Sequence, residues 1–209
     1  VAEMQDGQRE NEAFLRGEVV TAPVFSHRNH GREYGTFCLA VRRFSGVFDR
    51  LNVIAPMEML ARCPLSLGDT VQVQGEVRSY NNRTGEGSRL VITVYARAIS
   101  GEGEEHENRL VLSGALCKKP VLRRTPLGRD ICDLLLAVNR KYGRADYLPC
   151  IAWGALARKC AGRAVGERIS LTGRLQSRGY IKKLESGSEE RVAYEVSIMQ
   201  LSEGEEADK

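Results

Sequence analysis

Two aromatic residues, Tyr147 and Trp153, stand six positions apart in a short run rich in apolar residues. Side chains an even number of positions apart on a β-strand point to the same face, so both rings would share one face with Ile151. Leu148 and Cys150 take the other parity and would face the core. An aromatic pair on an open strand face is a surface on which flat rings can stack.

The next strand-like run places cations opposite its apolar residues. Its apolar parity comprises Ile169, Leu171 and Leu175, and its outward parity comprises Arg168, Thr172, Arg174 and Arg178. Single-stranded nucleic acid offers base faces to aromatic rings and phosphates to cations. We therefore predict a nucleic-acid surface here. The alternative is that Tyr147 and Trp153 pack in the core.

The net charge of +4 is unevenly distributed along the 209 residues. Residues 1–106 contain 12 Arg and no Lys against 14 acidic residues, a net charge of −2. Residues 107–202 contain 18 Lys and Arg against 9 acidic residues, a net charge of +9. A basic half is typical of a surface for a polyanion, although charge alone also fits a solvated basic face.

The chain aligns with itself at an offset of 97, which becomes 98 in the later part of the repeat. Gly17 falls on Gly114, for example, and Leu39-Ala40-Val41 falls on Leu136-Ala137-Val138. A tandem duplication of a whole domain explains this register. We predict a first repeat over 1–100, a Gly and Glu linker over 101–107, a second repeat over 108–201 and an acidic flexible tail over 202–209.

Each repeat shows five strand-like runs with one short helix after the third. In the second repeat the runs are 108–117, 131–140, 147–153, 167–177 and 191–201, and the helix is 154–160. In the first repeat, 56–63 is the corresponding helix. This order predicts an all-β protein with short helices, built from two tandem OB-folds, which are five-stranded Greek-key barrels.

The first repeat lacks the chemistry of the second. Arg50 and Pro56 take the positions of Tyr147 and Trp153. We expect the first repeat to keep the fold, to have lost most of its affinity, and to serve mainly in pairing or in lengthening a binding path.

The second repeat contains a series of short motifs in a fixed order. They are 108–114, Pro120, 124–128, 136–140, Trp153-Gly154 with Ala157, Gly166, and 173–178. Over about 108–201 the chain resembles the bacterial single-stranded DNA-binding protein family, an established example of binding by base stacking. The resemblance implies sequence-independent binding of single-stranded DNA in DNA replication, repair and recombination. It also implies a homodimer with four OB-folds, in the bacterial cytoplasm at the nucleoid.

The resemblance and the parity argument together give a set of candidate contacts. The aromatic candidates are Tyr142, Tyr147, Trp153 and Tyr180. The cationic candidates are Arg140, Lys141, Arg144, Arg174, Arg178, Lys182 and Lys183. The hairpin 179–190 would act as a flexible clamp. The family's acidic tip ends in an apolar pair that recruits replication and repair proteins, and residues 203–209 lack that pair.

Other classes of function receive less support from the residues. The six cysteines form no C-x-x-C pair and lie in apolar runs, so we expect reduced, buried thiols and no metal or other cofactor. His27 and His30 have no neighbouring carboxylates, so we expect no enzyme. We also expect no membrane span, because no long apolar run is present. An OB-fold interaction or primosome accessory module and an RNA binder remain alternatives.

Overall fold

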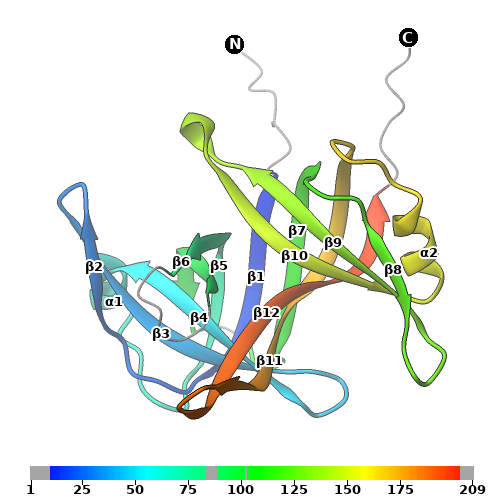
Figure 1. Cartoon of the computed structure of the whole chain (residues 1–209). Helices are drawn as coiled ribbons and strands as arrows, with labels where there is room; N and C mark the ends of the chain where they lie inside the picture. Colours follow the sequence, from blue (N-terminus) through cyan, green and yellow to red (C-terminus); the bar gives the residue numbers. More distant parts are fainter. Residues whose placement is uncertain (1–9, 83–88, 102, 203–209) are drawn as a thin grey trace, which may run out of the picture.

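The computed structural model describes residues 10–82, 89–101 and 103–202. The elements of the first repeat are β1 (Asn11–Val19), β2 (Val24–Asn29), β3 (Arg32–Arg42), β4 (Phe48–Pro56), α1 (Met57–Arg62), β5 (Thr70–Asn81) and β6 (Leu90–Ser100). Those of the second are β7 (Glu107–Leu116), β8 (Val121–Arg124), β9 (Asp130–Asn139), the 3-10 turn η1 (Lys141–Gly143), β10 (Ala145–Trp153), α2 (Ala155–Ala161), β11 (Arg168–Leu184) and β12 (Gly187–Ser202). Apart from η1, which only the second repeat has among the described residues, the same order of elements thus occurs twice (Figure 1).

Each repeat closes into an OB-fold barrel, as the strand pattern predicted. Extra pairings of β1 with β3 and of β7 with β9 close the two barrels. Gly17 and Gly114 permit this closure, because a Cβ there would lie 2.5 Å and 2.3 Å from the carbonyl oxygens of Ala40 and Ala137. The repeated glycine of the sequence is therefore a site of close backbone approach.

The predicted helices are confirmed, and the strands differ in two respects. The structure adds β2 and β8, short strands paired with β3 and β9, that the expected five runs did not include. The last two strands of the second repeat also run beyond their predicted ends at 177 and 191. They stay paired as far as Leu184 and Gly187, so the hairpin 179–190 is a two-stranded ribbon. Its polar residues had concealed the strands, because a ribbon clear of the core needs no apolar alternation.

The core follows the predicted alternation. Ile169, Leu171 and Leu175 are buried on β11. All six cysteines are free thiols. Cys132, Cys150 and Cys160 are buried as expected, whereas Cys38, Cys63 and Cys117 are partly exposed, so the expectation of buried thiols was wrong for these three. Burial raises the pKa of Cys160 to about 11, so that thiol stays protonated and behaves as an apolar side chain. Across 10–82, 89–101 and 103–202, the helices are too short to cross a membrane.

The two barrels join through β1 and β7, which pair antiparallel from Asn11 opposite Leu112 to Arg16 opposite Glu107. This pairing makes one sheet of the order β2-β3-β4-β6-β5-β1-β7-β11-β12-β10-β9-β8. Strands β1 to β6 of the first repeat correspond in turn to β7 to β12 of the second. Counted outward from the junction, the two halves of the sheet therefore have the same strand order. The repeats are therefore related by a pseudo-twofold axis between β1 and β7 (Figure 1).

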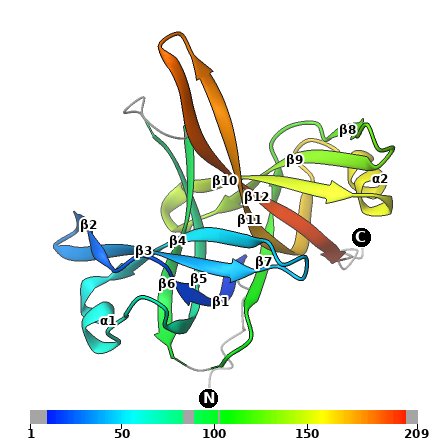
Figure 2. The ribbon, with the colours of Figure 1, turned by 90° about the horizontal axis from the view of Figure 1, so that it is seen from below.

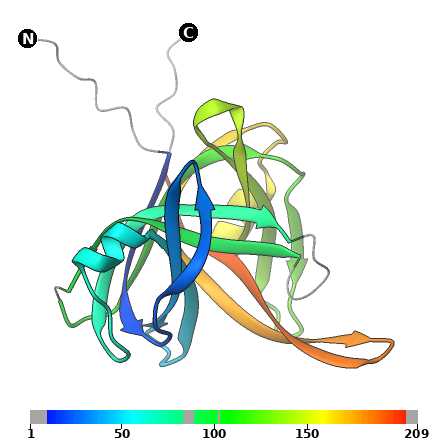
Figure 3. The same cartoon turned by 90° about the vertical axis from the view of Figure 1, so that its left-hand side faces the viewer.

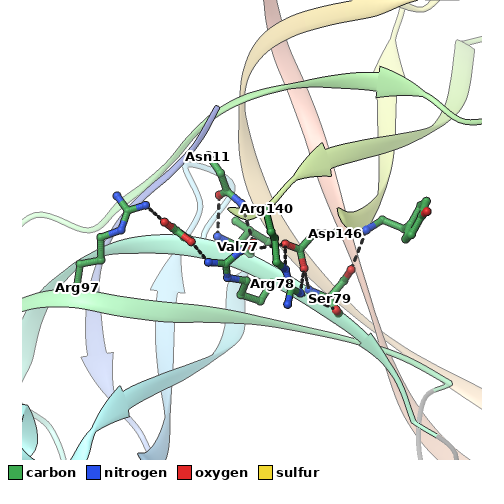
Figure 4. Close-up of polar contacts among 9 residues, drawn as sticks. Asn11, Val77, Arg78, Ser79, Arg97, Arg140 and Asp146 are labelled. Atoms are coloured by element: carbon green, nitrogen blue, oxygen red, sulfur yellow. Dashed lines mark hydrogen bonds and ion pairs between the residues drawn. The ribbon is translucent and has the colours of Figure 1, made fainter. Parts of the chain in front are cut away.

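Two buried aspartates strengthen this junction. Asp146, which has no exposed surface, accepts hydrogen bonds from Arg140 and, at 2.6 Å, from the backbone N–H of Ser79 in the first repeat. Arg78 of the first repeat also lies 3.3 Å from it (Figure 4). Each such carboxylate draws donors from both repeats, since a buried charge must be paired.

The symmetric partner of Asp146 is Asp49, which is 1% exposed. Asp49 accepts from Arg43 and, at 2.8 Å, from the backbone N–H of Ser177 in the second repeat. The junction thus repeats one motif of arginine, aspartate and serine on both sides of the pseudo-twofold axis.

The substitution Asp146→Asn should lower the free energy of unfolding by about 3 kcal/mol, because it leaves Arg140 without its buried counter-charge. Urea denaturation monitored by circular dichroism measures the loss. The control is Asp133→Asn, since that half-exposed carboxylate pairs with Arg123 at the surface and should cost less than about 1 kcal/mol. Equal small losses for both variants would contradict the role of Asp146.

Candidate nucleic-acid interface

The outer face of β10 presents the two aromatics first singled out in the sequence. Tyr147 is 51% and Trp153 is 41% exposed, so the alternative that they pack in the core is wrong. Leu148 and Cys150 are buried, as the parity predicted. Ile151 shares the parity of the aromatic pair but is 5% exposed, at the point where β12 pairs with β10.

Trp153 stands at a corner that is rich in cations. The guanidinium of Arg129 lies 5.7 Å from the centroid of the indole ring, within range of a cation–π contact. Nearby Asp130 accepts hydrogen bonds from Arg158 and Arg124, which lower the pKa of its carboxyl. Sequence reasoning missed Arg129, although its place just before the strand that pairs with Trp153 was a usable signal.

Tyr147 is positioned by the first repeat. Its backbone N–H donates a hydrogen bond of 2.8 Å to Oγ of Ser79 on β5. Ser79 in turn donates its own N–H to Asp146, the residue before Tyr147 (Figure 4). The backbone that carries one of the two exposed rings is therefore held from across the junction.

The connection from β9 to β10 displays a further aromatic. Tyr142 is 98% exposed and has φ of 66°, a left-handed conformation that is uncommon outside glycine. Lys141 and Arg144 flank it and are also exposed. A strained backbone that turns a ring entirely toward solvent favours a role in binding.

Arg140 differs from the other candidates in this connection. Its guanidinium binds Asp146 and donates to the backbone carbonyl of Ser79 at 3.2 Å. The hydrogen bond with Asp146 raises the pKa of Arg140, which stays charged and engaged. The structure therefore places Arg140 in the junction between repeats.

The ribbon formed by the outer parts of β11 and β12 carries four candidates. Arg178, Tyr180 and Lys182 alternate along one face of β11, and Lys183 lies on the other. Tyr180 is half-buried opposite Arg191, which pairs with Glu189 at 2.8 Å. The ribbon projects from the barrels on the side to which β5 and β6 also extend (Figures 2 and 3).

Arg174 is not brought together with the β10 aromatics. It lines a separate hollow of about 650 Å³ beside Arg42 and Arg43 of the first repeat. Its Nε is buried and has no hydrogen-bond partner within the described residues. The predicted contacts thus fall into the β10 face, the 141–144 connection, the ribbon and this isolated arginine.

The cations in these groups share an electrostatic property. Within the part of the chain that the structure describes, Lys141, Arg144, Arg178, Lys182 and Lys183 have no carboxylate partner. Other arginines of the second repeat do have one. Examples are the pairs Arg123–Asp133, Arg163–Glu167 and Arg168–Glu10. These unpaired cations therefore lie on the same two segments as the rings of Tyr142 and Tyr180.

The second repeat is similar to known proteins. Residues 107–202 match the single-strand binding protein family. The single-stranded DNA-binding protein of Clostridium tetani is 37% identical over 83 residues, which are 36% of this chain and 57% of that protein. Single-stranded DNA-binding protein A of Bacillus subtilis is 39% identical over 80 residues, 35% of this chain and 46% of that protein. The chain thus spans about half the length of these relatives.

A solved structure resembles the whole chain. The wild-type single-stranded DNA binding protein from Thermus aquaticus superposes with a TM-score of 0.77 at 23% sequence identity, over 95% of each chain. A deletion mutant of that protein gives the same TM-score at 24% identity. The match establishes the fold of both repeats, including the one outside the family match.

The symmetry of the junction gives a matched pair of variants. Ser79→Ala and Ser177→Ala each remove a hydroxyl that accepts a backbone N–H at 2.8 Å, from Tyr147 and Arg50 respectively. Each should lower the free energy of unfolding by about 1–2 kcal/mol, because a donor in the junction loses its partner. Thermal denaturation measures both losses. An unchanged midpoint for both variants would show that these hydroxyls do not hold the junction.

Proposed function

We propose, from the match of residues 107–202 to the single-strand binding protein family, that the chain binds and protects single-stranded DNA without sequence preference. The observation that carries the proposal is the exposure of Tyr147 and Trp153 on one strand face beside uncompensated cations. Bases would stack on these rings, and Lys or Arg would neutralise the phosphates between them. We infer binding in replication, repair or recombination, and no catalysis.

The second repeat provides most of the contacts in this proposal. Tyr147, Trp153, Tyr180 and Tyr142 are the stacking residues. The phosphate contacts are Lys141, Arg144, Arg178, Lys182 and Lys183, with Arg174 at a distance from them. Arg140 is left out because it already binds Asp146. The domain division that goes with the proposal is a divergent repeat over 1–100, a linker over 101–107, a binding repeat over 108–201 and a tail over 202–209, of which 203–209 and most of 1–10 lie outside the described residues.

We also propose the assembly that the family resemblance implies. Two chains would form a homodimer with four OB-folds, in the bacterial cytoplasm at the nucleoid, where replication or repair proteins could be further partners. Sedimentation velocity tests the assembly, with an expected mass of twice 23.2 kDa. A single species of 23.2 kDa at micromolar concentration would exclude the dimer.

Fluorescence of Trp153, the one tryptophan of the sequence, provides the direct test. Titration with oligo-dT should quench it, and the affinity should fall with salt at a logarithmic slope of about −0.7 for each phosphate contact. A parallel titration with oligo-U separates DNA from RNA. Absence of quenching and of binding at low salt would remove the proposed function.

Tyr147→Ala should weaken binding of oligo-dT about 5-fold or more, since stacking on one aromatic ring contributes about 1–3 kcal/mol. Trp153 remains as the reporter in this variant. The fold should be retained, because the Tyr147 side chain is half-exposed on the outer face. Binding as tight as that of the parent would show that the β10 face is not the stacking surface.

The double variant Lys182→Gln, Lys183→Gln tests the ribbon. It should reduce the magnitude of the salt slope by about 1.4, which corresponds to two phosphate contacts. Arg163→Gln is the matched control, because Arg163 already pairs with Glu167 and should leave the slope unchanged. An unchanged slope in the lysine variant would place the ribbon outside the DNA path.

A further inference from the structure

A hollow lies between the repeats and borders the β10 face at Ser79. Its volume is about 1060 Å³. The first repeat contributes His27 on β2 with Tyr95 and Arg97 on β6, and the second contributes Lys141, Tyr142 and Arg144. We call this hollow the inter-repeat groove.

Two side chains of the groove, His27 and Tyr95, are held by contacts with each other and with Tyr34 behind them. Tyr95 lies 5.9 Å from Tyr34, centroid to centroid, and Tyr34 stacks on His27 at 4.9 Å with the ring planes 6° apart. The hydroxyl of Tyr95 is also 3.4 Å from Nε2 of His27. A ring held in this way loses little conformational freedom when a ligand stacks on it.

The charge of the groove suits a polyanion. Five cationic residues line it against two acidic ones, Glu10 and Glu76. Arg97 and Arg78 both pair with Glu76, and Arg140 pairs with Asp146. Lys141 and Arg144 are left without a carboxylate partner within the described ranges. The rings therefore come mainly from the first repeat, and the uncompensated charges come from the second.

The pseudo-twofold axis supplies a comparison within the same molecule. The symmetric hollow beside Arg174 is smaller, about 650 Å³, and three cationic residues line it against four acidic ones. In the strand register, Tyr95 lies opposite Ile54 on β4, whereas Ser197 lies opposite Ile151 on β10. Ser197 and Met199 thus occupy the positions of Tyr95 and Arg97, so an OB-fold barrel forms without either of these residues.

We propose that the inter-repeat groove holds a further stretch of the single-stranded DNA, with a base against Tyr95 or Tyr142 and phosphates at Lys141 and Arg144. This inference rests on the proposed function and gives the first repeat a direct part in binding. The strand would pass between the groove and the outer face of β10, which meet where Ser79 binds the backbone of Tyr147.

The test is the double variant Tyr95→Ser, Arg97→Met in the full chain, because both replacements are residues that the second barrel holds at the equivalent positions. Oligo-dT of increasing length is titrated against Trp153 fluorescence. The shortest oligonucleotides that quench Trp153 should bind as they do to the parent. Longer ones should bind about 5-fold or more weakly, and fewer nucleotides should be occluded per chain.

Two further variants make the result specific. Arg163→Gln alters a cation that already pairs with Glu167 and lines neither hollow, and it should bind every length as the parent does. Lys141→Gln with Arg144→Gln alters exposed side chains alone, so a folding defect cannot account for its effect. It should reduce the salt slope for long oligonucleotides more than for short ones.

The outcomes separate this inference from the proposed function. Long oligonucleotides that bind both double variants as tightly as the parent, with the same number of nucleotides occluded, would overturn the groove and leave the β10 face in place. A parent chain that binds no oligo-dT of any length would overturn the proposed function and the groove with it.

Discussion

The arrangement of this molecule depends on two buried carboxylates at the junction, each of which must find hydrogen-bond donors in both repeats. Asp49 and Asp146 are charges removed from water, which is costly unless every acceptor is satisfied. Each takes an arginine from its own repeat and a backbone N–H from the other. Neither carboxylate can be fully satisfied in an isolated repeat. The duplicated domains are therefore joined by shared polar groups as well as by the ladder between β1 and β7.

This junction also decides where the binding chemistry can lie. Strand β5 of the first barrel contacts β10 of the second, and β11 of the second barrel contacts β4 of the first. In each barrel, β4 or β10 is therefore bordered by a strand of the other barrel. Within that symmetric frame the two copies carry opposite chemistry at matching positions. Glu76 faces one hollow where Arg174 faces the other, and Tyr95 stands where the second copy has Ser197. One backbone arrangement thus supports two different surfaces, since outward side chains contribute little to closing a barrel.

Much of this structure could be read from the sequence, because alternation and repeat register are local signals. They gave the barrels, the helices and the face of β10 that bears Tyr147 and Trp153. The place of Arg140 in the junction could not be predicted, because one of its acceptors, the carbonyl of Ser79, lies 61 residues away in the other repeat. The groove was hidden for another reason. The first repeat was compared only at the positions of Tyr147 and Trp153, where it has Arg50 and Pro56. The ring of Tyr95 lies on β6, whose equivalent in the second repeat carries Ser197. Strands β2 and β8 and the ribbon of β11 and β12 were missed because they lack the apolar periodicity on which strand prediction relies.

The uneven charge of the sequence acquires a sharper meaning once the ion pairs are known. The net charge of +9 on residues 107–202 suggests a uniformly basic domain. Several of its arginines are neutralised locally, as in the pairs of Arg123 and Arg163. Lys141, Arg144, Arg178, Lys182 and Lys183 have no carboxylate partner among the described residues. The first two lie in the exposed connection that carries Tyr142, and the other three lie on the ribbon that carries Tyr180. Charges left uncompensated at such positions repel one another in the free protein, which is why the proposed function assigns them to phosphate binding and not to folding.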